Sequence, residues 1–438
     1  MSNSQDVQAK RSWLPKAHPV SWGMLAIGTS SMLLISIDRQ ILPTVLPAIM
    51  KEFGMNSTQG GFISSLNFIG TLLGAAIIGV VADSIGRGYK RTWAWWGSCF
   101  LAIISGLATF FTKGVFNLQL WRVVMGLGTG AMEPANVALV SDFWQKENRG
   151  FALGVNHTGM PLGQFIGPAL LSVVLLYGGW RDAFLWIPAI GILLILAQWL
   201  VGSKKNEMKV RGWIDEHNMT QPYSKEDVEN KLGVKQSFMN AVNSLKNRNI
   251  RLAITMDFLF LWTEMGVATF LTLYLMDHLG IGLAQAALIS GASGITGWFG
   301  LILWGTVSDH IGRRPALGIV TVGFAATVFC LTFINSVPTA WAMLIVWGLF
   351  RNAPFAVINS LTVDSAPKEA ASSLGFLVGI GYGLSGTLVS PVIGWVIDQW
   401  GYSTSYVILA ISCLLVFIPL LMAKETAGRK LKERQLQG

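Results

Sequence analysis

Long apolar runs, separated by short polar connections, recur along the whole chain. A helix needs about 20 apolar residues to cross a hydrocarbon layer about 30 Å thick. We therefore predict an all-α membrane protein with twelve transmembrane helices, at residues 20–47, 57–82, 92–111, 117–143, 150–176, 182–202, 252–276, 284–308, 316–334, 338–364, 372–398 and 402–422.

One long hydrophilic stretch leaves six of these helices on either side of it. The boundaries predict an N-terminal tail (1–19), a first six-helix bundle (20–202), an inter-bundle loop (203–250), a second six-helix bundle (251–423) and a C-terminal tail (424–438). We expect the loop and both tails to be cytoplasmic.

Composition and charge support this interpretation. The chain of 438 residues is 52% hydrophobic and 13% charged, with a mean hydropathy of +0.52, whereas soluble proteins carry about 25% charged residues. With both termini cytoplasmic, only Lys51, Lys113 and Arg181 fall on the outer side, as the positive-inside rule requires. The net charge of +9 therefore reflects a multi-pass plasma membrane protein, in a bacterium one of the inner membrane, and not a nucleic-acid-binding protein.

The two halves repeat each other. The segments "GVVADSIGRGYKR" (79–91) and "GTVSDHIGRRPAL" (305–317) share Gly, Asp, Gly and Arg at identical spacing. Residues 126–147 align without gaps to residues 348–369, which pairs Asp142 with Asp364. Such repetition indicates a duplicated six-helix unit, with a ligand site at the interface between the halves.

The first of these segments resembles the loop 2–3 signature of the major facilitator superfamily, and the second resembles its degenerate copy. Arg122 followed by Gly126 and Gly130 resembles that family's fourth helix, and "GMPLGQFIGP" (159–168) its fifth. The resemblance implies a secondary transporter in which two pseudo-symmetric bundles rock against each other. It also implies a gating latch made of Gly79, Asp83, Gly86, Arg87, Arg91, Asp309 and Arg313.

Within that superfamily, "IDRQILPTVLPAIMKEFGM" (37–55) and "GWRDAFLWIPAIG" (179–191) resemble the anion:cation symporter branch. This resemblance implies uptake of sugar acids or other organic anions, often together with protons. The chain departs from the branch in helix 4. It has Thr129 where the branch usually has a glutamate, and its own glutamate, Glu133, lies four residues later.

Seven charged residues lie inside the predicted helices: Asp38, Arg39, Arg122, Glu133, Asp257, Glu264 and Arg351. Each costs about 2.5–3.5 kcal/mol at the bilayer centre when it is unpaired. We therefore expect all of them to face water, a ligand or one another.

Neighbouring helical residues point about 100° apart, so Asp38 and Arg39 cannot pair with each other. We predict that Arg39 faces the central cavity, where a planar guanidinium suits a carboxylate. Asp38 would face its own bundle and pair with Arg122, in a structural or a coupling role. Arg351, on helix 10, would clamp the anion from the other half.

Proton coupling is assigned first to Asp38 and Glu133, assisted by Arg122, and next to Glu264. A buried carboxyl beside an arginine that changes partner can load and release a proton. Asp257 lies nearer the cytoplasmic end and is a coupling or gate candidate.

Five further residues are candidates for lining the substrate site: His157, Trp262, Asn352, Asn359 and Tyr382. His157 breaks the pseudo-symmetry, because its counterpart in the second half is Ile380. For the histidine and the aromatic residues, simple packing is the alternative.

No enzymatic motif is visible, and no metal-ligand spacing occurs around Cys99, Cys330 or Cys413. "GYGLSG" (381–386) follows no predicted strand and is interpreted as helix packing. We expect no enzyme activity and no cofactor beyond a coupling proton.

The function predicted from the sequence is proton-coupled symport of a small organic anion, a monocarboxylate or sugar acid, by alternating access. The partners are this anion and the lipid bilayer, with no nucleic acid, and the protein is expected to be a monomer. One alternative is a drug/H⁺ antiporter, which should have an acidic, aromatic cavity with fewer arginines. The other is a sugar or polyol carrier, which would use Asn, Gln and Trp.

Overall fold

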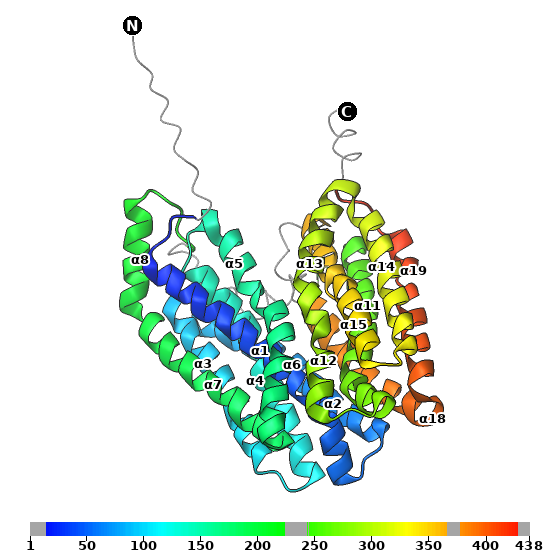
Figure 1. The fold of residues 1–438 in the computed structure, drawn as a ribbon. Coiled ribbons are helices and arrows are strands. Elements are labelled where there is room, and N and C mark those ends of the chain that lie inside the picture. Colours follow the sequence, from blue (N-terminus) through cyan, green and yellow to red (C-terminus); the bar gives the residue numbers. More distant parts are fainter. Residues whose placement is uncertain (1–14, 224–242, 244, 366–376, 428–438) are drawn as a thin grey trace, which may run out of the picture.

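The computed structural model describes residues 15–223, 243, 245–365 and 377–427, with the backbone alone for residues 76–84 and Val378. The described residues form helices and no strands, arranged as two groups (Figure 1). Within them, ten helical stretches are long and apolar enough to cross a membrane. The all-α membrane fold is confirmed.

The first group contains α1 (Pro19–Phe53), α2 (Ser57–Ile85), η1 (Gly88–Lys90), α3 (Arg91–Phe110), α4 (Val115–Asp142), η2 (Lys146–Asn148), α5 (Arg149–His157), α6 (Gly159–Tyr177), α7 (Trp180–Val201) and α8 (Lys204–Glu216). The second contains α11 (Arg248–Leu279), α12 (Leu283–Ser290), α13 (Ala292–Ile311), α14 (Arg313–Cys330), η3 (Leu331–Phe333), α15 (Val337–Arg351), α16 (Ala353–Ser365), the π-helical η5 (Leu377–Leu384), α18 (Ser385–Leu414) and α19 (Phe417–Met422).

Several predicted helices are interrupted or joined. The predicted spans 150–176, 284–308 and 338–364 are each divided into two helices, α5/α6, α12/α13 and α15/α16. Conversely, α18 runs through both of the last two predicted spans, but Gly401 has a φ of 78° and breaks its helical path there. The first helix extends beyond its predicted end to Phe53. Its 35 residues span about 50 Å, more than the hydrocarbon thickness, so α1 must cross at a tilt.

The two bundles meet at the end opposite the chain termini and diverge toward the end where the termini lie (Figure 1). At the closed end, the backbone N–H groups of Ser57 and Thr58 donate to the Asp398 carboxylate at 2.9 and 2.8 Å. A Cβ on Gly61 would overlap the carbonyl group of Ser390, so α2 and α18 touch backbone to backbone.

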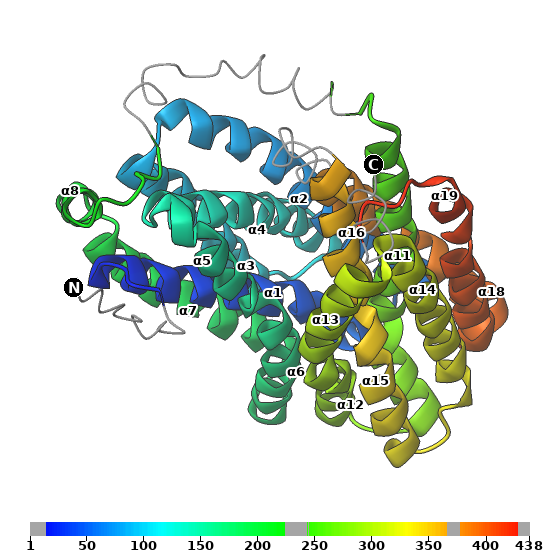
Figure 2. The same cartoon turned by 90° about the horizontal axis from the view of Figure 1, so that it is seen from above.

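Helix α6 is a second contact between the bundles. It packs against α1 on one side and against α12 and α13 on the other (Figure 2). The core of the second bundle also includes Leu46 and Met50 of α1. These contacts bring α1, α6 and the second bundle together near the middle of the molecule.

Helices α2 and α4 pack through glycines spaced four residues apart. Gly70 and Gly74 of α2 face Gly126 and Leu127 of α4, while Gly130 faces Thr71. Small residues at this spacing let two membrane helices approach closely. The glycines of the helix 4 motif therefore have a packing role inside the first bundle.

Replacing Gly126 by alanine should lower the free energy of unfolding by about 1–3 kcal/mol, the usual cost of overpacking a tight contact. The new Cβ would overlap the Asn67 carbonyl oxygen and lie 2.8 Å from the Gly70 Cα. The measurement is thermal unfolding of the purified protein in detergent. Gly97→Ala is the matched control, because nothing lies within 4 Å of a Cβ there. Equal melting temperatures for the two variants would contradict the packing role.

Candidate functional site

An ion pair from the first bundle lies between the two halves of the molecule. Arg39 of α1 donates from Nη2 to Glu133 Oε2 of α4 at 2.8 Å, and both side chains are mostly buried, at 15% and 17% exposure. The Arg39 guanidinium also lies over the ring of Tyr382, 4.4 Å from its centroid. Arg39 Nε is buried and has no hydrogen-bond partner among the described residues. Arg39 therefore faces the other bundle and keeps donors unused.

A second ion pair belongs to the other bundle. Arg351, the last residue of α15, donates from Nε to Glu264 Oε1 of α11 at 2.8 Å. Its Nη1 donates to Ser293 Oγ of α13 at 2.8 Å, and its guanidinium lies 4.8 Å from the centroid of the Trp347 ring. The Arg351 and Glu264 side chains are only 8% and 10% exposed.

The two pairs lie on equivalent helices of the two bundles, with their polarity reversed. In the first bundle, the arginine is on the first helix and the glutamate on the fourth, α1 and α4. In the second, the glutamate is on the equivalent first helix, α11, and the arginine on α15. Tyr382 of the second bundle lies under Arg39 and so connects the first pair to the other half of the molecule. Sequence reasoning proposed these four side chains but did not predict this pairing.

Helix α6 connects the residues that follow each arginine. Gln40 Nε2 donates to the Gly163 carbonyl at 2.9 Å, and Asn352 Nδ2 donates to Gln164 Oε1 at 2.7 Å. Since Gly163 and Gln164 are consecutive, one short stretch of α6 binds the residue that follows each arginine. Gln164 was missed by sequence reasoning, although it is a polar residue inside an apolar, glycine-rich run.

Helix irregularities occur around this site. Pro43 lacks an N–H, so the carbonyl of Arg39, four residues earlier, loses its helical hydrogen bond. Pro354 has the same effect on Phe350, and α15 ends at Arg351. Tyr382 lies in the π-helical η5, a kind of segment that is frequent at functional sites. The bends and breaks thus lie beside the charged residues.

The predicted pair of Asp38 and Arg122 is wrong as a direct contact, because no ion pair joins them. Arg122 instead donates to Thr109 Oγ1 at 2.7 Å and lies 4.2 Å from the centroid of the Phe184 ring. Asp38 is 7% exposed, and its Oδ1 has no hydrogen-bond partner. The packing of Arg122 against α3 and α7 holds its guanidinium away from Asp38, so the two charges interact only through space.

The remaining candidate residues are dispersed around the site. Asp257 is buried against Gly381 of η5 and forms no ion pair or hydrogen bond with the described residues. His157 is exposed and lies seven residues before Gln164, two turns along the same face of the α5–α6 path. Trp262 packs on Phe258, with 5.9 Å between ring centroids. Asn359 of α16 is exposed.

The gating candidates form a cluster within each bundle. In the first, Asp142 accepts from Gly88 N at 2.7 Å and from Arg91 Nη1 at 2.9 Å. The positive φ values of Gly86 (115°) and Gly88 (68°) shape this turn. Gly79 and Asp83 lie in the stretch of α2 whose side chains are outside the described part. Asp142 was matched by the repeat but was not proposed as a site residue.

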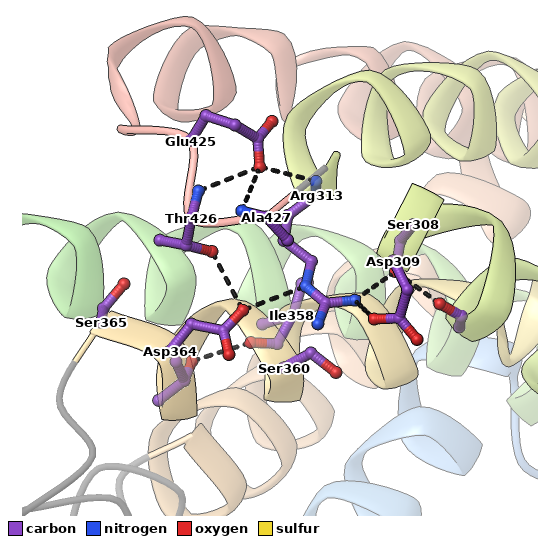
Figure 3. Close-up of polar contacts among 12 residues, drawn as sticks. Ser308, Asp309, Arg313, Ile358, Ser360, Asp364, Ser365, Glu425, Thr426 and Ala427 are labelled. Carbon is purple, nitrogen blue, oxygen red and sulfur yellow. Dashed lines mark hydrogen bonds and ion pairs between the residues drawn. The ribbon is translucent and has the colours of Figure 1, made fainter. Parts of the chain in front are cut away.

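The equivalent cluster of the second bundle is shown in Figure 3. Arg313 pairs with Asp309 at 2.5 Å and with Asp364 at 3.2 Å, and donates to Ser308 Oγ at 2.6 Å. Asp364 is the repeat counterpart of Asp142, and it was also missed as a site residue. The inter-bundle latch stays a prediction, because the contacts described here join residues of one bundle.

An acidic residue that follows the last long apolar helix of each bundle completes each cluster. Glu425 accepts from the backbone N–H of Arg313 at 2.7 Å (Figure 3) and from that of Arg314 at 2.9 Å. In the first bundle, Glu207 of α8 accepts from Tyr89 N at 2.9 Å and from the Tyr223 hydroxyl. Burial and this hydrogen bond raise the pKa of the Tyr223 phenol. Glu425 thus caps the start of α14, and Glu207 binds the backbone of η1, just before α3.

We expect Glu425→Ala to reduce the free energy of unfolding by about 0.5–2 kcal/mol, the usual cost of losing a helix N-cap. The change leaves two N–H groups of the first turn of α14 without their acceptor. Thermal unfolding in detergent measures the loss. Glu216→Ala removes an exposed glutamate of α8 and should be neutral; a similar effect of both substitutions would argue against the cap.

Comparisons with known proteins agree with this architecture. The family model described as Major Facilitator Superfamily matches residues 29–274 and 253–437. The chain is 28% identical to a probable sulfoacetate transporter of Cupriavidus necator, over 83% of this chain and 84% of that protein. It is 23% identical to a benzoate transport protein of Acinetobacter baylyi, over 94% and 91% of the two chains.

A solved structure shows the same fold. The xylose transporter of E. coli in a partially occluded inward-open conformation superposes with a TM-score of 0.72 at 15% identity, covering 94% of this chain and 100% of that one. The match of the family model to most of the chain, together with the two-bundle fold, identifies a membrane transporter and not an enzyme. The chain belongs to the Major Facilitator Superfamily.

Proposed function

We propose that this protein takes up a small organic anion together with protons, by alternating access of a site between the two bundles. The observation that carries the proposal is the Arg39–Glu133 pair. It lies between the halves, and its arginine still has unused donors. In this proposal the protein is a monomer in the plasma membrane of a bacterium, with both termini cytoplasmic.

The chemistry of the pair links anion binding to protonation. While Glu133 is ionised, it is the counter-ion of Arg39 and competes with a substrate carboxylate for the same guanidinium. Once Glu133 takes up a proton, Arg39 has no counter-ion there, and a substrate carboxylate can replace it with two parallel N–H···O bonds. Proton and anion therefore favour each other's binding, as symport requires.

The contacts between the bundles supply the conformational part of the cycle. Arg39 of the first bundle lies on Tyr382 of the second, so an anion held by Arg39 also touches the other half. Asp398 binds the start of α2 at the closed end. With cytoplasmic termini, the present state opens inward. His157, Asn352, Asn359 and Trp262 remain proposed lining residues, while Asp38, Arg122 and Asp257 remain proposed for coupling.

The names of the relatives support an anionic substrate. Sulfoacetate and benzoate are organic anions, and another relative, 22% identical over 87% of this chain, is a gallate transporter of Pseudomonas putida. A lipophilic cation would meet two arginines in this site. A neutral sugar has no acid group that could replace a glutamate on either arginine, so neither ion pair would take part in binding it.

Uptake into proteoliposomes tests the proposal. With an inward proton gradient, we expect accumulation of radiolabelled benzoate or sulfoacetate above the level in protein-free liposomes, and loss of accumulation when a protonophore collapses the gradient. Gradient-driven extrusion of a lipophilic cation, or accumulation of xylose in place of the acids, would replace the proposal by an antiporter or a sugar carrier.

A further inference from the structure

We propose that the Arg351–Glu264 pair is a second acid-binding position, so that the site takes a short organic dianion with one acid group for each arginine. The inference rests on the proposed function and deepens it. It assigns the substrate to compounds with two acid groups, such as dicarboxylates or sulfocarboxylates, in place of monocarboxylates.

The second position has the same construction as the first. Each consists of an arginine and a glutamate from two helices of one bundle, with an aromatic ring under the guanidinium, Tyr382 for Arg39 and Trp347 for Arg351. Arg351 has an additional neutral partner, Ser293, which would keep the guanidinium oriented while its glutamate is exchanged for a substrate group. The second position is therefore prepared to hold an acid in the same way.

The two positions are also adjacent. Gln40 and Asn352, the residues that follow the two arginines, donate to consecutive residues of α6. Arg39 lies over the ring of Tyr382, a residue of the second bundle, so the first position contacts the bundle that holds Arg351. A molecule with acid groups at both ends can thus reach one arginine in each bundle and connect the halves.

Charge balance is met by a monoanion with one proton or by a dianion with two protons, so the two cases differ in the number of positions used. Two arginines and two ionised glutamates sum to zero, and an uncompensated buried charge is costly. A monoanion with one proton uses only one position and leaves the other pair closed. A dianion with two protons converts both glutamates to neutral acids and uses both arginines, and the sum again is zero.

The charged and titratable groups that face the two pairs must be counted in any pH effect. Tyr382 on η5 lies against Arg39, and other charged residues buried in the helices that carry the pairs are Asp257 on α11, Asp38 on α1 and Arg122 on α4. The groups from α6 and α13 are the neutral Gln164 and Ser293. Among the described residues, Glu133 and Glu264 are the carboxylates that bind the two arginines directly.

Calorimetry on the purified full-length protein tests this proposal with two probes that stay ionised at every relevant pH, ethane-1,2-disulfonate and ethanesulfonate. Titration in two buffers of different ionisation enthalpy counts the protons taken up per ligand. We expect the dianion to bind at least about tenfold more tightly than the monoanion near pH 6. We also expect uptake of two protons with the dianion and one with the monoanion.

The double variant Glu264→Gln/Arg351→Gln is the decisive protein, because it leaves no buried charge unpaired. It should bind the dianion about as weakly as wild-type protein binds the monoanion, with uptake of one proton. Matching elution volume and melting temperature would verify its fold. The proton counts on wild-type protein need no variant and decide the question if the double variant does not fold.

The outcomes separate this inference from the proposed function. Equal affinity and equal proton uptake for the two probes in wild-type protein, or unchanged dianion binding in the double variant, would overturn the second position and leave anion symport standing. Absence of binding by both disulfonate and monosulfonate, together with no uptake of benzoate or sulfoacetate, would overturn both.

Discussion

Arg39→Gln abolishes proton-driven uptake of the organic anion, with a loss of at least about 100-fold at subsaturating substrate. A hydrogen-bonded charge pair is worth roughly 1.5–3 kcal/mol, and its loss also removes the bidentate geometry that a carboxylate requires. Initial uptake rates into proteoliposomes and calorimetric affinity measure the effect. Arg39→Lys keeps the charge without the planar fork, so it should retain only part of the affinity.

The matched control is Arg181→Gln, which removes an arginine from another ion pair of the first bundle. Arg181 lies 2.6 Å from Glu52, and the two side chains are 29% and 40% exposed. An exposed pair contributes about 0–1 kcal/mol, so this variant should keep normal uptake. If the Arg39→Gln variant bound benzoate and sulfoacetate as tightly as the wild type, Arg39 would not be the anion-binding residue.

Glu133→Gln has the second largest expected effect, and it separates binding from coupling. Glutamine cannot ionise, so Arg39 has no ionised counter-ion in α4, and the anion binds with little dependence on pH through this position. We expect accumulation driven by a proton gradient to fall to the equilibrium level, while exchange of internal for external substrate continues. The measurement pairs gradient-driven uptake with counterflow in the same vesicles.

Glu52→Gln is the control for this variant, because Glu52 binds Arg181 and Trp180 outside the site. It should accumulate substrate like the wild type. Retained accumulation in Glu133→Gln would show that the coupling proton is carried elsewhere, with Glu264 and Asp38 the next residues to replace.

The membrane fold was predictable from local properties. Apolar run length located α1, α3, α4 and α7 well, since a helix that crosses hydrocarbon must be apolar over about 20 residues. Helix interruptions were harder to predict. The break between α15 and α16 lies near Pro354, which is visible in the sequence, but the π-helical form of η5 depends on packing and carries no such signal.

The site was predictable as a set of residues but not as a set of pairs. Arg39, Glu133, Glu264 and Arg351 were identified because ionisable groups in hydrocarbon are too costly without a partner. Sequence spacing cannot relate α1 to α4 or α11 to α15, so it could not show that Arg39 meets Glu133. The expected contact of Asp38 with Arg122 was wrong because Thr109 and Phe184 hold the guanidinium.

The sequence by itself determined the membrane class, the duplication and the presence of charges that must lie between two bundles. These properties follow from hydrophobic run length, from repeated spacing and from the cost of burying charge. Each can be read from the order of residues in the chain, without knowing which helices touch. Only the tertiary structure decided which carboxylate neutralises which arginine, and that Tyr382 lies beneath Arg39. Partner choice depends on distances between helices far apart in the chain, and packing alone sets those distances.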